Sequence, residues 1–137
     1  MNSSFFTAIA VLEIAALANT LAGAWLTHDF LREVTCINSF HSMERFKRYA
    51  ATQMYQALLQ IGFLGLPFLL FTYGMIQKSL NPWGFIAVIG PTLVILIISV
   101  KLKAMEKRIA NLPVDETYKA EFAHVYHVWM NEPFPTW

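Results

Sequence analysis

Three long stretches without charged side chains most strongly constrain this chain. Residues 1–28 contain a single charged residue, Glu13, and residues 49–77 and 79–100 contain none. A helix of about 20 apolar residues crosses a hydrocarbon core roughly 30 Å thick, and inside that core the backbone must satisfy its own hydrogen bonds. The sequence therefore predicts an all-α integral membrane protein with three transmembrane helices.

The composition supports this class and excludes others. Charged residues make up 14% of the 137-residue chain, against about a quarter in soluble domains. A single cysteine excludes a secreted disulfide scaffold, and a net charge of +1 excludes a nucleic-acid binder. The expected partners are the lipid bilayer and other membrane protein subunits, or further copies of the same chain, and no cofactor is expected.

The spans cover about residues 5–26, 57–76 and 83–100, and leave polar segments at 27–56 and 101–137. An acidic Glu13 inside the first span, with no basic residue before it, predicts that this span is retained and not cleaved as a signal peptide. Nine of the ten Lys and Arg residues fall in the two polar segments. The positive-inside rule therefore predicts an outside N-terminus and a cytoplasmic C-terminus, as in a bacterial inner membrane. This threading resembles in outline the proton-channel subunits of bacterial biopolymer-transport motors.

The polar segments are expected to extend the membrane helices within one membrane domain, residues 1–137, because neither segment alone is long enough to bury a core. A cap at Ser42 predicts that the second helix starts there, and the third helix is expected to reach about Asn111. The two helices then form a long antiparallel hairpin that extends into the cytoplasm. Asp115 is expected to cap an amphipathic C-terminal helix that ends near Met130.

Polar side chains inside the spans are the first candidates for function, because they are costly in hydrocarbon. Glu13 lies near the bilayer centre at the depth of Thr92, and Asn19 lies deeper, at the level of Gln60. One interpretation is that a protonated Glu13 and the amides are polar clips between helices. The other is that Glu13, Asn19, Gln60 and Thr92 line a path for protons or cations. Three glutamines at helical spacing, Gln53, Gln56 and Gln60, also form one face of the second helix.

Small residues in the spans predict close helix contacts. They are Ala16, Thr20, Gly23, Ala24, Gly62 and Gly65. Gly62, Gly65 and Pro67 are further expected to interrupt the second span, and Gly90 and Pro91 the third. Paired interruptions mark binding sites in some transporters, and such a site would here need an oligomer to complete its walls.

The C-terminal segment carries an aromatic stripe and a weak metal motif. The aromatic side chains are expected to dock on the hairpin, on the lipid interface or on a partner protein. They are Tyr118, Phe122, Trp129, Phe134 and Trp137. Glu121, His124 and His127 recur at helical spacing, which resembles the Glu-x-x-His element of carboxylate-bridged metal sites, although such sites need matching residues from other helices.

The sequence contains none of the common catalytic or phosphate-binding motifs. The leading expectation is therefore a small accessory or scaffolding subunit that works through helix and tail contacts with a larger membrane complex. The first alternative is an oligomeric proton- or cation-conducting unit that uses Glu13. The second alternative is a metal- or lipid-handling membrane enzyme that uses His124 and His127.

Overall fold

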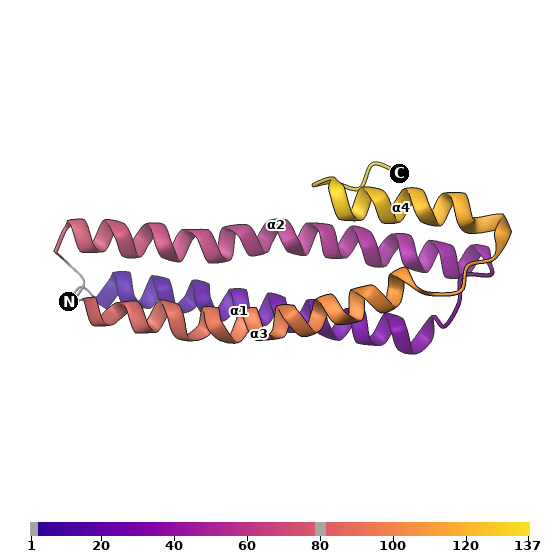
Figure 1. Ribbon diagram of the computed structural model, residues 1–137. Coiled ribbons are helices and arrows are strands. Elements are labelled where there is room, and N and C mark those ends of the chain that lie inside the picture. The colour runs from indigo at the N-terminus through magenta and orange to yellow at the C-terminus, as the bar shows by residue number, and fades with distance from the viewer. Residues whose placement is uncertain (1–2, 79–81) are drawn as a thin grey trace. The chain divides into compact units, whose positions relative to one another are not determined.

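The computed structural model describes residues 3–78 and 82–137, and these residues are almost entirely helical (Figure 1). The helices are α1 (Ser3–Glu33), α2 (Phe40–Ile76), α3 (Phe85–Ala110) and α4 (Lys119–Asn131), with short 3₁₀ turns η1 (Pro82–Gly84) and η2 (Glu116–Tyr118). The described residues contain no strand, only one isolated bridge between Ile37 and Val114. The predicted all-α class is confirmed.

Three of the helices are long and apolar enough to cross a membrane, namely Ser4–Glu33, Phe40–Ile76 and Pro82–Ala110. This suggests a multi-pass membrane protein, as the sequence predicts. The expected interruptions at Pro67 and Pro91 are wrong, because both prolines lie inside continuous helices. Membrane helices tolerate proline when neighbouring groups and local adjustments satisfy the freed backbone carbonyl.

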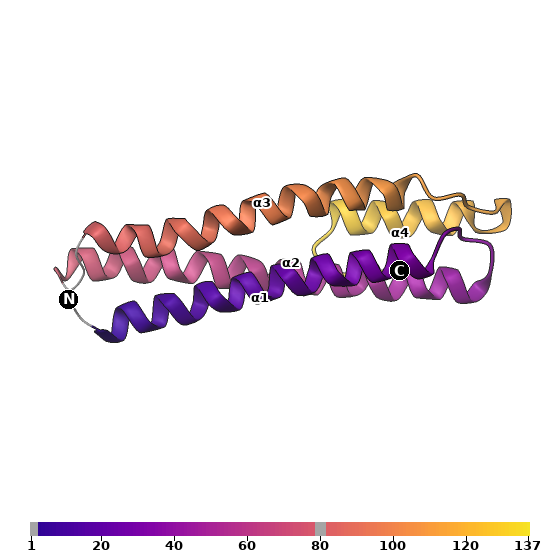
Figure 2. The ribbon, with the colours of Figure 1, turned by 90° about the horizontal axis from the view of Figure 1, so that it is seen from below.

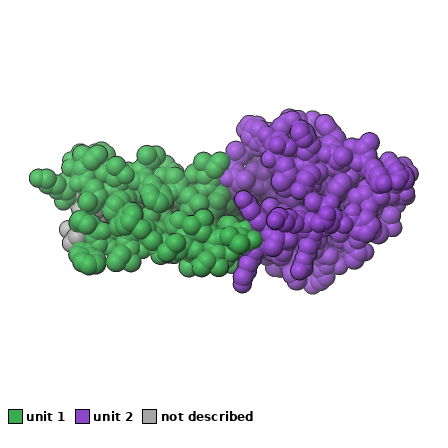
Figure 3. All heavy atoms as spheres, in the orientation of Figure 1, with its two compact units in different colours: residues 1–21, 59–100 green, residues 22–58, 101–137 purple. Residues whose placement is uncertain are grey.

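The chain divides into two compact units (Figure 3). Unit 1 comprises residues 1–21 and 59–100. In its described part α2 runs antiparallel to α1 and α3 (Figures 1 and 2). Ile9 and Val88 form a small buried cluster there, whereas Ile14, Ile61 and Leu69 are 68%, 70% and 67% exposed. Large apolar side chains on the outside are what a surface in contact with lipid requires.

Unit 2 comprises residues 22–58 and 101–137 and has a larger core, to which all four helices contribute. Its buried members are Phe30, Val34, Ile37, Met43, Phe46, Tyr49, Ala50, Ile109, Phe122 and Val125. Helix α4 packs on α2 through aromatic rings. The Phe46 and Phe122 rings stack with centroids 4.6 Å apart, and Trp129 meets Tyr49 edge-on at 5.5 Å. The two polar segments of the sequence thus share one core, although neither would bury a core alone.

The helix ends differ from the predicted ones by a few residues. The Ser39 hydroxyl accepts from the Ser42 backbone N–H at 3.2 Å, and the Ser42 hydroxyl accepts from the Ser39 N–H at 3.0 Å. This reciprocal pair makes Ser39 the N-cap and Ser42 the third helical residue, so the predicted cap at Ser42 is wrong. Helix α4 begins at Lys119, four residues after Asp115, because the 3₁₀ turn η2 intervenes.

Two connections of unit 2 are joined by backbone hydrogen bonds. The Ile37 N–H donates to the Pro113 carbonyl, and the Asp115 N–H donates to the Ile37 carbonyl, both at 2.8 Å. These bonds form the parallel bridge between Ile37 and Val114. They fix the segment between α1 and α2 against the segment between α3 and α4.

Candidate functional site

Glu13 lies on α1 inside unit 1 and is 1% exposed. Its Oε2 is 3.5 Å from the Thr92 hydroxyl on α3, and that hydroxyl also lies 2.7 Å from the Val88 carbonyl. A hydroxyl has one proton, and the shorter contact to Val88 takes it. The geometry therefore suits a neutral Glu13 that donates to the Thr92 oxygen. The other carboxyl oxygen, Oε1, is buried and has no hydrogen-bond partner within the part of the chain that the structure describes.

About two turns further along α1, a series of side-chain hydrogen bonds joins α1 to α2 within unit 1. Asn19 Nδ2 donates to Gln60 Oε1 at 2.7 Å, and Gln60 Nε2 donates to the Thr20 hydroxyl at 2.9 Å. Thr20 in turn donates to the Ala16 carbonyl at 2.9 Å, which leaves its oxygen free to accept. Both the oxygen and the nitrogen of the Gln60 side-chain amide are therefore hydrogen-bonded to residues of α1. The structure brings Asn19 and Gln60 together, and it adds Thr20, which the sequence suggested only as a small packing residue.

A second polar network lies in unit 2, again between α1 and α2. Thr27 is fully buried, donates to the Gly23 carbonyl at 2.9 Å and lies 2.6 Å from the Tyr49 hydroxyl. Because the Thr27 proton is already used and a phenol is neutral at pH 7, Tyr49 is the donor in that pair. Gln53 Nε2 donates to the Gly23 carbonyl at 3.1 Å and to Thr27 at 3.3 Å.

Sequence reasoning missed Thr27 and Tyr49 as members of a polar network. The available signal was the helical spacing of Gln53, Gln56 and Gln60, which marks a polar face on α2. That spacing does not show which residues of α1 face it.

The predicted packing residues fall into two groups. Ala16 is fully buried, and a Cβ placed on Gly23 would lie 3.2 Å from the Gln56 Oε1, so Gly23 permits a close approach of α2. Gly62 and Gly65 differ from the expectation, because a Cβ at either position would meet nothing within 4 Å among the described residues. The glycine face of α2, defined here by Gly62 and Gly65, is therefore open. Ala24 is half-buried.

Most of the predicted docking aromatics lie against the chain's own core. Phe122 belongs to the buried cluster of unit 2, and Tyr118, Trp129 and Trp137 pack partly buried against it. Phe134 is 53% exposed. Of the five aromatic side chains, Phe134 thus offers the largest free surface for another molecule.

The weak metal motif lies on the outer face of α4. Glu121 forms an ion pair with Lys47 of α2, and a His127 ring nitrogen lies 3.2 Å from the Asn131 amide. No group of three or more His, Cys, Asp or Glu side chains that could hold a metal ion occurs in the described residues.

Comparison with models of known protein families, with curated proteins and with solved structures finds no match to this chain.

Proposed function

We propose that this chain is a small accessory or scaffolding subunit that acts through helix and tail contacts with a larger membrane complex. The observation that carries the proposal is the open glycine face of α2, Gly62 and Gly65, where a Cβ would meet nothing within 4 Å among the described residues. Helix association in lipid depends on small residues that let two backbones approach closely. A face of this kind, with no occupant among residues 3–78 and 82–137, suits a helix from another subunit.

Neighbouring side chains extend this face. Leu66 and Leu69 are 48% and 67% exposed, and on α2 they follow Gly62 and Gly65, respectively, by four residues, which places them on the same face. By contrast, Asn19 and Gln60 bond to each other within the chain, so their polar groups serve the fold. The outer surface is left to apolar contacts.

Residues 101–137, the C-terminal tail, are proposed to make a second contact with the membrane complex. With nine of the ten basic residues in 27–56 and 101–137, the proposed orientation puts the first turns of α2, the last turns of α3 and all of α4 in the cytoplasm, as in a bacterial inner membrane. Phe134 is the exposed aromatic side chain of the tail. We expect it to contact the same complex.

The proposal is tested by native mass measurement of the full chain extracted in mild detergent from its source membrane, with all co-purifying chains identified. We expect a partner chain at fixed stoichiometry, and we expect Gly65→Leu to lose it because the added side chain fills the open face. Ala57→Leu is the matched control, since it adds comparable bulk at an exposed position of the same helix. A partner that stays bound to Gly65→Leu, or the absence of any partner, would contradict the proposal.

A second candidate function is an oligomeric unit that passes protons through Glu13. It is favoured by the buried Oε1 atom, which lacks a hydrogen-bond partner among the described residues. An unpaired buried oxygen of this kind can accept a hydrogen bond from a water molecule, which would connect Glu13 to a proton path. Glu13→Gln distinguishes the candidates, because the amide can still donate to Thr92 but cannot release a proton. Proton flux into vesicles that persists in Glu13→Gln, or is absent from the wild type, excludes this candidate.

A further inference from the structure

The C-terminal end of α3, residues 101–110, carries a basic surface in unit 2. Its four cations all have exposed side chains, and they are Lys101, Lys103, Lys107 and Arg108. The only carboxylate in the same stretch is Glu106, which is half-buried. The four cations together are named here the basic face of α3.

Helical spacing places these cations on the outside of the helix. Lys103 and Lys107 are four residues apart, and Lys101 and Arg108 are seven apart, so each pair shares one side. The fully buried Ile109 and the half-buried Glu106 are three residues apart and lie on the opposite side. Because Ile109 belongs to the core of unit 2, the basic face of α3 is turned away from that core.

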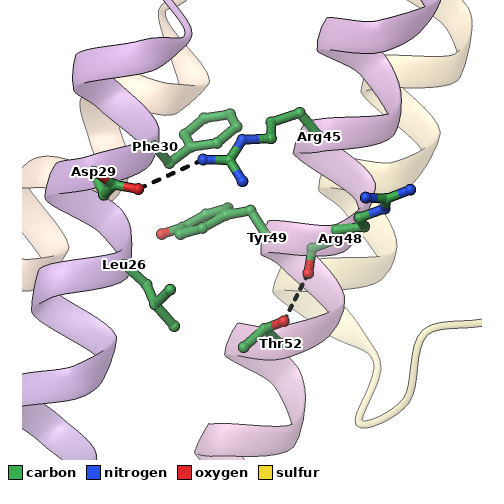
Figure 4. A pocket seen from close by; sticks show the side chains of 7 residues that line it. All are labelled: Leu26, Asp29, Phe30, Arg45, Arg48, Tyr49 and Thr52. Carbon is green, nitrogen blue, oxygen red and sulfur yellow. Dashed lines mark hydrogen bonds and ion pairs between the residues drawn. The ribbon is translucent and has the colours of Figure 1, made fainter.

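Most other cations of unit 2 have carboxylate partners. Figure 4 shows Arg45 directed at Asp29, 3.5 Å away, and Arg45 also pairs with Glu33. The remaining pairs are Arg32 with Asp29, Lys47 with Glu44 and Glu121, and Lys119 with Glu116. Within residues 3–78 and 82–137, no cation of the basic face of α3 takes part in an ion pair. This face therefore offers charged donors to another molecule.

The helix dipole accounts for only part of this charge. Lys107 and Arg108 lie in the last turn of α3, where the partial negative charge of the free carbonyl groups stabilises a cation. This effect is confined to about one turn, and Lys101 and Lys103 lie earlier in the helix. The dipole does not explain why the basic face of α3 extends back to Lys101.

The position of this face along α3 matches the level of lipid headgroups. Residues 79–100 contain no charged residue, and Lys101 follows them directly. Ile97 and Val100 are 62% and 70% exposed. Lys101 follows Ile97 by four residues and Lys103 follows Val100 by three, so exposed apolar side chains lead directly into the basic face along one helix. Such a change from apolar to basic residues marks the end of the hydrocarbon region.

We propose that the basic face of α3 binds the phosphate groups of anionic phospholipids at the membrane surface. The lysine ammonium groups donate to the phosphate oxygens, while their methylene stems lie along the apolar boundary. Clusters of about four to eight basic residues directly after a membrane helix attract anionic lipid in this way. An acidic protein would match the charge but not the adjoining apolar residues. The inference goes beyond the proposed function, because it requires no partner protein.

The test uses native mass spectrometry of the purified full chain in mild detergent. Phosphatidylglycerol, phosphatidylcholine or a hexaglutamate peptide is titrated in separate arms, and the bound molecules per chain are counted. We expect tighter binding of phosphatidylglycerol than of phosphatidylcholine. Lys101→Gln combined with Lys107→Gln should weaken phosphatidylglycerol binding about thirtyfold, since each basic residue near an anionic lipid surface contributes about fivefold. Lys103 is left unchanged because it interacts electrostatically with Glu106.

Two control variants accompany this measurement. Arg32→Gln combined with Lys119→Gln also removes two positive charges from exposed side chains of unit 2, but these cations are already paired, with Asp29 and Glu116. We expect this variant to keep the wild-type affinity for phosphatidylglycerol. Lys101→Arg combined with Lys107→Arg keeps both charges of the basic face and should keep that affinity too.

Three results would overturn the proposal. The first is equal phosphatidylglycerol affinity in the wild type and in the glutamine variant of the basic face. The second is an equal loss in the control at Arg32 and Lys119, which would show general charge attraction without a site. The third is hexaglutamate binding as tight as that of phosphatidylglycerol and lost in the same variant, which would assign the face to an acidic protein.

Discussion

The sharpest prediction concerns Thr27, the fully buried centre of the polar network in unit 2. Replacing it by valine keeps its shape nearly unchanged, so little cavity is formed, but the acceptor for the Tyr49 hydroxyl is removed at a site where the two oxygens lie 2.6 Å apart. Gln53 keeps its bond to the Gly23 carbonyl at 3.1 Å. The main effect is thus one buried donor without a partner, which costs about 1–3 kcal/mol.

A double variant at Thr27 and Tyr49 tests whether the cost comes from the unpaired Tyr49 donor. Tyr49→Phe alone should cost about 1 kcal/mol, the net value of an ordinary hydrogen bond. Thr27→Val with Tyr49→Phe removes both partners, so no donor is left unsatisfied. We therefore expect the double variant to be less destabilised than the sum of the single variants, by about 1 kcal/mol.

The assay is reversible unfolding of the purified chain in mixed micelles, followed by far-UV circular dichroism. Thr52→Val is the control, because Thr52 is exposed and its hydroxyl bonds only to the Arg48 carbonyl of its own helix, at 2.9 Å. We expect that control to change the free energy of unfolding by at most about 0.5 kcal/mol. If Thr27→Val matched the control, or if the double variant were simply additive, the reasoning on the buried network would be refuted.

Three further predictions use the same unfolding assay. Gln60→Leu removes both amide contacts to α1, and we expect a loss of about 0.6 kcal/mol and at most about 1.7, the range for hydrogen bonds between membrane helices; a loss above 3 kcal/mol would contradict this. Gly62→Ala should stabilise the chain by up to about 1 kcal/mol, because alanine favours a helix and the added Cβ meets open space. Gly23→Ala should not stabilise the chain, since its Cβ would lie 3.2 Å from the Gln56 side-chain oxygen. A more stable Gly23→Ala than Gly62→Ala would contradict these two glycine environments. Phe122→Ala should cost about 3–5 kcal/mol because the ring is in the core, and the exposed Phe134→Ala at most about 0.5; equal effects would contradict the packing of α4.

Counting residues from the span ends was enough to place some polar contacts. Asn19 and Gln60 lie at the same depth in antiparallel spans, and the structure joins them by a hydrogen bond of 2.7 Å. Glu13 and Thr92 are placed in the same way and lie 3.5 Å apart. Depth is predictable because a helix rises a fixed 1.5 Å per residue.

The core of unit 2 could not be predicted in the same way. Phe30, Ile109 and Val125 belong to separate parts of the sequence and meet only in three dimensions. The aromatic stripe of the last helix was visible, but its periodicity does not tell whether it packs on this chain or on another one. The apolar face of the last helix is therefore predictable from the sequence, but the residues that pack against it are not.

The glycines show a similar limit. Gly23 and Gly65 look alike in an apolar helix, yet one approaches a glutamine side chain and the other faces open space. Which face of a helix turns inward depends on contacts with residues far away in the sequence. Only the three-dimensional arrangement separates the two positions.

The bridge between Ile37 and Val114 has a practical consequence for changes in chain length. Both backbone groups of Ile37 are used, one with Pro113 and one with Asp115. Surface connections normally accept inserted residues with little loss of stability. Here an insertion in either connection would shift one partner past the other and break both bonds, so tags and reporter sequences placed there should disturb the fold. Any chain that shares this fold should keep the lengths of these two segments constant.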